Sequence, residues 1–145
     1  MRVSDILAAK KGEKVHTVRP HESIENLVQR LRLERIGALV VSESGYTVDG
    51  IISERDVAHG LAEHGADILN RTVRELMTGA VITCPPEESL AHVAKLMTHR
   101  RIRHVPIVDG KRLIGIVSIG DVVRYRLDEL ELEQNVLRDY AVARS

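Results

Sequence analysis

The stretch Gly115-Ile-Val-Ser-Ile-Gly-Asp121 decides the fold, because a nearly identical stretch, Gly50-Ile-Ile-Ser-Glu-Arg-Asp56, occurs earlier in the same chain. In each copy a glycine, two β-branched residues and a serine are typical of a short buried strand. An amphipathic helix is predicted to begin near the aspartate. Where a strand leads into a helix, free backbone N–H groups lie beside the serine hydroxyl and the aspartate carboxylate.

This strand-to-helix corner allows two interpretations. Serine and aspartate are common helix caps, so Ser53, Asp56, Ser118 and Asp121 could serve only to stabilise helix starts. Alternatively, the carboxylate accepts hydrogen bonds from ribose hydroxyls, while the N–H groups and the serine hydroxyl suit a phosphate. The repetition favours a ligand site, because packing alone does not require the same Ser-x-x-Asp spacing twice.

The rest of the chain is duplicated as well. Shifting the sequence by 66 residues aligns similar residues, namely Thr17 with Thr83, Pro20 with Pro86, Ser23 with Ser89, Leu27 with Val93 and Leu31 with Met97. The offset is 65 at the two motifs and 70 between residues 3–7 and 73–77, so insertions fall in loops. We therefore predict a first repeat at 1–66, a second repeat at 67–127 and a helical extension at 128–145.

Each repeat is expected to contain a helix followed by two strands. The predicted helix caps are Ser23 and Ser89, and the predicted core-facing residues are Ile24, Leu27, Val28, Leu31, Leu90, Val93, Ala94 and Met97. Strands are expected at 38–41, 50–53, 105–108 and 115–118, with turns at 44–45 and 109–110. The capping-box spacing of Thr72 and Glu75 predicts a short helix at 72–77. The extension either packs on its own domain or forms a dimer contact.

Composition excludes several classes of function. The 145 residues include 21 Lys and Arg against 21 Asp and Glu, and a net charge of zero argues against general binding to nucleic acid or anionic membrane. No apolar run approaches the roughly 18 residues of a membrane span. The single cysteine, Cys84, excludes an internal disulfide and fits a reducing cytoplasm, where we expect the protein.

The sequence also lacks the usual motifs of metal sites and enzymes. Its seven histidines form no i, i+4 pair, and no Cys-x-x-Cys exists, so no metal site is expected. Nucleophile-elbow, Walker and dinucleotide-binding patterns are missing. Cys84, which is followed by two prolines, is interpreted as a small buried residue rather than a nucleophile. We therefore expect no catalytic activity.

Together these patterns resemble the CBS domain, named after cystathionine β-synthase, present as a tandem pair over residues 1–127. The resemblance is carried by the two motifs above, by Arg-Ile-Arg-His-Val-Pro-Ile-Val-Asp at 101–109 and by Glu-Leu-Met-Thr at 75–78. Stand-alone bacterial CBS-pair proteins are similar in particular. The resemblance implies an α/β fold in which two β-α-β-β-α repeats form a pseudo-twofold pair, or Bateman module, here with an extra C-terminal helix.

The resemblance further implies two clefts that take AMP, ADP, ATP or another adenosyl compound such as NAD. Carried over residue by residue, one cleft would use Ser53, Arg55 and Asp56, the backbone from Val81 to Thr83, and Arg103 and His104. The other would use Ser118 and Asp121, the backbone from Val15 to Thr17, and Gly37 and Ala38. The basic residues all fall on the first cleft, so we expect it to hold phosphate more tightly.

The expected function is regulatory. An adenine-nucleotide sensor of energy or redox state, which needs no cofactor and passes its ligand state to an unidentified protein partner, fits these features. A structural dimerisation module without a ligand and an enzyme acting on nucleotides remain the alternatives. A homodimer is expected in any case, because Val57, Leu61, Val122 and Val123 would need cover from a second copy.

Overall fold

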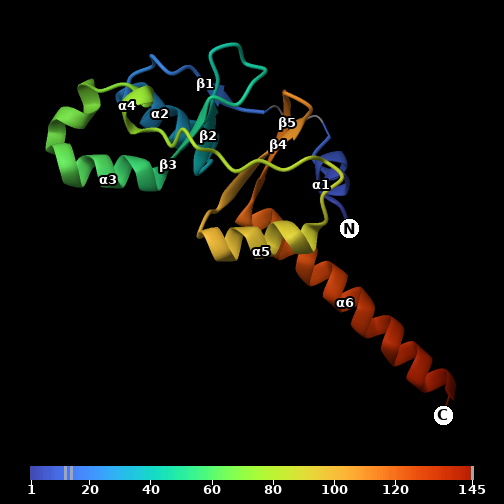
Figure 1. Cartoon of the computed structure of the whole chain (residues 1–145). Coiled ribbons are helices and arrows are strands. Elements are labelled where there is room, and N and C mark those ends of the chain that lie inside the picture. Colours follow the sequence, from blue (N-terminus) through green and yellow to red (C-terminus); the bar gives the residue numbers. More distant parts are fainter. Residues whose placement is uncertain (12, 14, 145) are drawn as a thin grey trace. The chain divides into compact units, whose positions relative to one another are not determined.

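The structure, a computed structural model, describes residues 1–11, 13 and 15–144, so the last residue of the predicted extension lies outside the described residues. The chain contains both helices and strands, with two β-hairpins separated by a run of helices (Figure 1). The helices are α1 (Val3–Ala9), α2 (Ile24–Glu34), α3 (Glu54–His64), the 3-10 helix η1 (Gly65–Asn70), α4 (Val73–Leu76), α5 (Leu90–Arg100) and α6 (Ile119–Arg144). The strands are β1 (Thr17–Val18), β2 (Ala38–Val41), β3 (Gly50–Ser53), β4 (His104–Asp109) and β5 (Arg112–Ser118).

The chain folds as two compact units. Unit 1 contains residues 1–13, 84–107 and 115–145, and unit 2 contains residues 14–83 and 108–114. These units do not follow the order of the sequence, because the short helix that precedes each repeat joins the unit of the other repeat. The predicted boundaries of the sequence repeats remain a prediction.

Helix α1 packs on the second repeat. The Val3 N–H donates to the Glu88 carbonyl at 2.9 Å, and the Leu90 N–H donates to the Met1 carbonyl at 3.0 Å. Val3 and Ile6 on this helix are fully buried. Residues at the start of α1 therefore form backbone hydrogen bonds with residues at the N-terminus of α5, which lies more than one repeat later in the sequence.

Helix α4 makes the same contacts in unit 2. The Val73 N–H donates to the Glu22 carbonyl at 2.9 Å, and the Ile24 N–H donates to the Arg71 carbonyl at 2.9 Å. Val73 is fully buried, as Val3 is in unit 1. Each repeat thus packs against the short helix that precedes the other repeat in the sequence.

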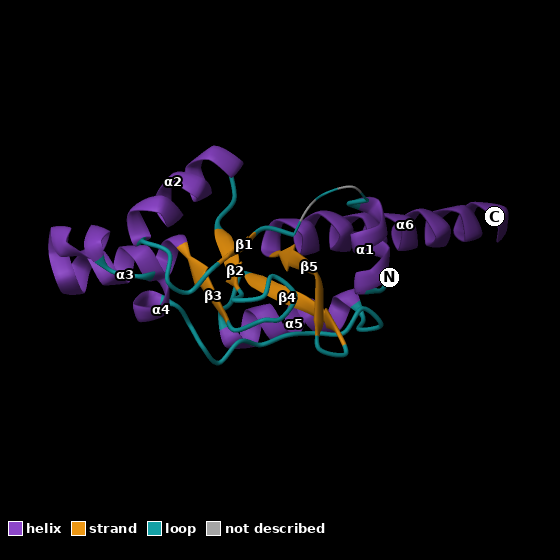
Figure 2. Cartoon of the chain, turned by 90° about the horizontal axis from the view of Figure 1, so that it is seen from above, coloured by secondary structure: helices purple, strands orange, loops and turns teal. Residues whose placement is uncertain are grey.

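The sheet of unit 2 has the strand order β1-β2-β3 and lies next to α2, α3 and α4 (Figure 2). Strand β2 pairs with β1 in parallel and with β3 in antiparallel register, which puts Ala38 opposite Ser53. All four β2 residues are buried, as expected of a central strand that is covered on both faces. Leu27, Leu39 and Ile52 are fully buried members of the core beside it.

The sheet of the second repeat pairs β4 with β5. Along β5 the residues after Arg112 alternate between buried and half-buried, with Gly115 and Val117 on the buried side, which is the two-residue period of a strand. Both strands were predicted, but they extend beyond 105–108 and 115–118. The turn glycines Gly45 and Gly110 have φ angles of 85° and 64°, so both turns use the left-handed region that favours glycine.

The predicted caps of the two long core helices are confirmed. Ser23 accepts a hydrogen bond from the Asn26 N–H and Ser89 accepts one from the His92 N–H, both at 3.1 Å. The core-facing prediction fails at Val28, which is 38% exposed, and Ala94 is only half-buried. Val28 directly follows the buried Leu27, and Ala94 directly follows the buried Val93. Each therefore lies at the edge of the buried stripe of its helix.

The predicted helix at 72–77 is present as Val73–Leu76, but its capping box does not form. The Thr72 hydroxyl donates to the Glu75 carboxylate at 3.4 Å instead of accepting a backbone N–H. The second carboxylate oxygen of Glu75 is paired with Arg71 at 3.2 Å. Thr72 forms an antiparallel bridge with Ser23, so its backbone is held by α2 rather than by a cap.

Helix α6 corrects the prediction for the C-terminal segment. The last helix of the second repeat continues without a break to Arg144, and every described residue from Leu130 onward is exposed. The interpretation in which the extension packs on its own domain is therefore wrong. Within the described residues, no helix combines the length and the apolar character that a membrane crossing requires.

Two of the four residues expected to need cover are already covered. Val122 is 4% exposed, and Val57 packs partly against the core of unit 2. Leu61 and Val123 are 53% and 51% exposed, as expected. Of the four residues expected to need cover, each helix that follows an aspartate therefore leaves one exposed, Leu61 on α3 and Val123 on α6.

Candidate functional site

The first strand-to-helix corner lies in unit 2, where Ser53 ends β3 and caps α3. The Ser53 N–H donates to Asp56 Oδ2 at 2.8 Å, and the Asp56 N–H donates to Ser53 Oγ at 3.4 Å. This is a reciprocal capping box. Helix α3 accordingly begins at Glu54, slightly earlier than predicted, and Asp56 is its third residue.

The second corner repeats this geometry in unit 1. The Ser118 N–H donates to Asp121 Oδ2 at 2.9 Å, and the Asp121 N–H donates to Ser118 Oγ at 3.2 Å. Asp121 is only 6% exposed, whereas Asp56 is half-buried. The capping interpretation therefore holds in both copies, and any ligand contact must be made by groups that also serve as caps.

At each corner the first N–H of the helix donates to the carbonyl of the residue that precedes the neighbouring strand. The Glu54 N–H donates to the Gly37 carbonyl at 3.0 Å, and the Ile119 N–H donates to the Arg103 carbonyl at 2.8 Å. An antiparallel pair of strands brings the residue before one strand next to the residue after the other. Gly37 thus lies beside the corner of Ser53, and Arg103 lies beside the corner that begins α6.

Lys10 makes a strong contact at the second corner that the sequence did not predict. Its ammonium group lies 2.5 Å from Asp121 Oδ2 and 3.4 Å from the Ile116 carbonyl oxygen. Lys10 follows α1, the helix that packs on the second repeat. At the repeat offset of 70 the residue equivalent to Lys10 is Ala80, which carries no charge. This difference between the repeats is the feature of the sequence that could have pointed to Lys10.

The ion pair changes the electrostatics of the second corner. Burial acts to raise the pKa of Asp121, but the hydrogen bonds from Lys10 and from Ser118 act to lower it, and the net result is a pKa below the ordinary value. Asp121 is therefore held as a carboxylate with a cation already in contact. In the first copy no ammonium group can come from the equivalent position, because Ala80 stands there.

The predicted site residues are divided between the two units. Unit 1 contains Arg103, His104, Ser118 and Asp121, and unit 2 contains Val15, Thr17, Gly37, Ala38, Ser53, Arg55, Asp56, Val81 and Thr83. Within unit 2 the structure brings Gly37 and Ala38 to the corner of Ser53. Each predicted cleft combines residues of both units, so the two assignments stay predictions.

Other groups with possible chemistry are accounted for by packing. Among the described residues, no cluster of histidine, cysteine, aspartate and glutamate could hold a metal ion. Cys84 is buried as predicted, and burial, with a smaller effect of the Glu88 charge, raises the pKa of its thiol. A buried thiol with a raised pKa is a poor nucleophile.

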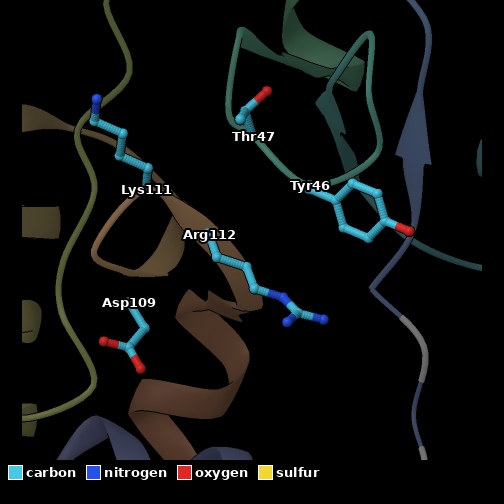
Figure 3. A pocket seen from close by; sticks show the side chains of 5 residues that line it. All are labelled: Tyr46, Thr47, Asp109, Lys111 and Arg112. Atoms are coloured by element: carbon cyan, nitrogen blue, oxygen red, sulfur yellow. The ribbon is translucent and has the colours of Figure 1, made fainter.

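A shallow, open hollow of about 580 Å³ lies between the turns of the two hairpins (Figure 3). Tyr46 and Thr47 line it from the β2–β3 loop, and Asp109, Lys111 and Arg112 line it from the β4–β5 turn. The Arg112 guanidinium lies 5.8 Å from the centre of the Tyr46 ring. The lining residues are not among the predicted site residues, so we do not assign the ligand site to this hollow.

Comparison with known proteins agrees with this architecture. A solved CBS-domain containing protein from Agrobacterium tumefaciens is 40% identical, with a TM-score of 0.82, and the match covers 87% of this chain and 99% of that chain. The CBS domain pair of protein MJ0100, solved in complex with 5-methylthioadenosine and S-adenosyl-L-methionine, is 30% identical with a TM-score of 0.75, over 89% and 98% of the two chains.

A curated relative and a family model point the same way. The mitochondrial CBS domain-containing protein CBSX3 of Arabidopsis thaliana is 36% identical over 123 residues, which are 82% of this chain. This chain spans only 60% of that relative's length. The family model of the CBS domain matches residues 3–63 and again residues 73–128. The chain therefore belongs to the CBS-domain family and contains two copies of the domain.

Proposed function

We propose that this chain is a regulatory module that binds an adenosine-containing ligand and passes its ligand state to a protein partner. The ligands to be considered are AMP, ADP, ATP, NAD and S-adenosylmethionine. The observation that carries the proposal is the duplicated Ser-x-x-Asp corner, with the same hydrogen bonds in both copies. The adenosine compounds bound by the similar CBS pair of MJ0100 support this ligand class.

The chemistry of the corner suits a ribose. A carboxylate that is held in place by its own backbone N–H still has lone pairs for the hydroxyl donors of a sugar. Asp56 is held by the Ser53 N–H and by the Ser53 hydroxyl, which fixes its orientation before a ligand arrives. A preorganised acceptor gains affinity because less conformational entropy is lost on binding.

The two copies should differ in affinity. At the second corner a ribose has to compete with the Lys10 ammonium group for Asp121. At the first corner the equivalent residue is Ala80, and the proposed phosphate contacts from Arg55, Arg103 and His104 belong to this cleft. We therefore assign the tighter site to the copy that contains Asp56.

The proposed residues of the two clefts are those given by the family resemblance. The first cleft contains Ser53, Arg55, Asp56, Val81, Thr83, Arg103 and His104, and the second contains Val15, Thr17, Gly37, Ala38, Ser118 and Asp121. A homodimer that communicates with an unidentified effector protein completes the proposal. A ligand-free dimerisation module is the second candidate, favoured by the exposed apolar residues of α6.

Isothermal titration calorimetry tests the ligand class directly. Wild-type protein should bind at least one of AMP, ADP, ATP, NAD and S-adenosylmethionine. Asp56→Asn should weaken that binding by about tenfold to a hundredfold, because the ribose loses a charged acceptor. An asparagine can still accept the Ser53 N–H, so the helix cap is kept.

Asp5→Asn is the matched control for this substitution. Asp5 accepts the Arg2 N–H at 2.8 Å and is the third residue of the capping box of α1, just as Asp56 is in α3. Affinity should be unchanged in Asp5→Asn. Heat from none of the five ligands with folded protein would leave the dimerisation module as the better description, and equal affinity in wild type and Asp56→Asn would refute the assigned site.

A further inference from the structure

Helix α6 carries an exposed apolar stripe along most of its length. Val123, Leu127, Leu130 and Leu137 are 51%, 60%, 46% and 68% exposed. Figure 1 shows that α6 continues well past α5, the helix against which its first turns pack. A helix of 26 residues is about 39 Å long, so a large part of this stripe is available to a partner.

The stripe has the spacing of a coiled-coil seam. The steps from Val123 to Leu127, Leu130, Gln134, Leu137 and Ala141 alternate between four and three residues. This 3-4 spacing is the a and d pattern of a heptad repeat, with one polar residue, Gln134, at an a position. A single polar a residue commonly fixes the register and the number of strands.

The seam does not coincide with the side of α6 that faces the rest of unit 1. Asp121 and Val122 are buried on that side, and Tyr125, Arg126 and Glu129 are half-buried. At about 100° per residue, the seam is turned by about 130° from the middle of this side. Leu132, which is 65% exposed, lies opposite the seam and offers a control position.

The charges that flank the seam select the partner and its direction. In a parallel pair each g residue faces the e residue five positions later on the other helix, so Arg126 faces Glu131 and Glu133 faces Arg138. Both contacts join opposite charges, and each occurs twice by symmetry. Arg126 also contacts Glu129 in its own chain at 3.4 Å, so Glu133 and Arg138 form the cleaner pair.

The antiparallel alternative is disfavoured by the same charges. A register that packs Leu127 against Leu137 of the other helix and Gln134 against Leu130 places Glu131 opposite Glu131 and Glu133 opposite Glu133. Like charges at these positions repel, and they provide the usual discrimination between coiled-coil orientations.

We infer that α6 pairs with α6 of a second copy of this chain as a parallel two-stranded coiled coil. This interaction surface goes beyond ligand binding and does not depend on it. The seam spans fewer than three heptads, so it supplies a limited share of the free energy of dimerisation. A measurement at the seam itself is therefore more decisive than the total mass.

Disulfide cross-linking measures the seam directly. In a parallel pair the two d residues at position 137 face each other, so Leu137→Cys should form a covalent dimer on mild oxidation. Leu132→Cys, on the opposite side of α6, should not, and wild type with its buried Cys84 gives the background. Equal cross-linking of Leu137→Cys and Leu132→Cys, or none in Leu137→Cys, overturns the inference. A link that forms only between Leu127→Cys and Leu137→Cys in a mixture establishes the antiparallel arrangement and also overturns it.

Charge exchange tests the specificity of the pairing. Arg138→Glu places Glu133 against a glutamate in both symmetric contacts, and the cross-linking of Leu137→Cys in that background should fall by about tenfold. The double change Glu133→Arg with Arg138→Glu restores opposite charges and should restore cross-linking. Glu133 and Arg138 are five positions apart and are therefore not neighbours within one helix, so the exchange removes no contact between these two residues in the same chain. Cross-linking that ignores both changes refutes the assigned g-to-e contacts.

Discussion

Replacing Lys10 with methionine should destabilise the protein by leaving a buried carboxylate without its cation. The side chain of Asp121 is 8% exposed and that of Lys10 is 24% exposed. Removing one partner of a fully buried ion pair typically costs about 3 to 5 kcal/mol, while an exposed pair contributes about 1 kcal/mol or less. The partial exposure of Lys10 places this pair between the two cases, at about 2 kcal/mol.

The pH dependence distinguishes this ion pair from simple packing. Because the folded pKa of Asp121 is lowered, its contribution to stability is present above the unfolded value of about 3.9 and is lost as the pH falls through the folded pKa. In Lys10→Met burial still acts to raise the pKa of Asp121, but the Lys10 contact that lowered this pKa is gone, so the pKa of Asp121 rises. The variant can then protonate Asp121 more easily. Its loss of unfolding free energy relative to wild type should therefore be smaller at pH 4 than at pH 7.

Urea unfolding at pH 7 and at pH 4 provides the measurement. A loss of about 2 kcal/mol corresponds to a midpoint lower by about 1 M for a protein of this size. Lys11→Met is the matched control, because Lys11 is the next residue and is exposed. Equal midpoints for Lys10→Met and Lys11→Met at pH 7, or a deficit of the same size at both pH values, would show that the ion pair does not stabilise the fold.

Two further substitutions test the proposed phosphate site and the packing of the repeats. Arg103→Ala should weaken AMP binding by about tenfold to a hundredfold and leave adenosine binding unchanged, and calorimetry that finds both affinities as in wild type contradicts the phosphate contact. Gly50→Ala should cost about 1 to 3 kcal/mol in urea unfolding, because a Cβ there would lie 2.6 Å from Met77 Sδ and 3.0 Å from the Thr78 carbonyl oxygen. That carbonyl is held by the Ile51 N–H at 3.0 Å, so it cannot easily move. Gly79→Ala, with no atom within 4 Å of the added Cβ, should be neutral, and equal stability of the two variants would contradict this reasoning.

Local signals in the sequence predicted most of the secondary structure. Ser23 and Ser89 act on N–H groups three residues away, so their role depends only on neighbouring sequence. The strands 38–41 and 50–53 were predicted with their observed bounds, because a short apolar run between turn residues leaves few alternatives. The corners were also recognised, and their repetition made them the candidate site.

Features that depend on contacts distant in sequence could not be predicted in the same way. Thr72 has the spacing of a capping box, but its backbone pairs with Ser23 and the box does not form. The pairing of Lys10 with Asp121 joins residues 111 positions apart. The absence of a helix break near Leu127 could have been noticed, because the segment contains no glycine or proline after Gly120.

The exchange of short helices explains why the two corners differ despite their nearly identical motifs. Helix α1 crosses to the second repeat and brings Lys10 to Asp121, while α4 crosses to the first repeat and is followed by Ala80 at the matching position. A substitution in the segment before one repeat therefore acts on the corner of the other. In a duplicated protein such segments can change one site without altering the shared motif, and the fold that both motifs support is retained. The asymmetry of the proposed ligand sites would then arise from the connections between the repeats as well as from the motifs themselves.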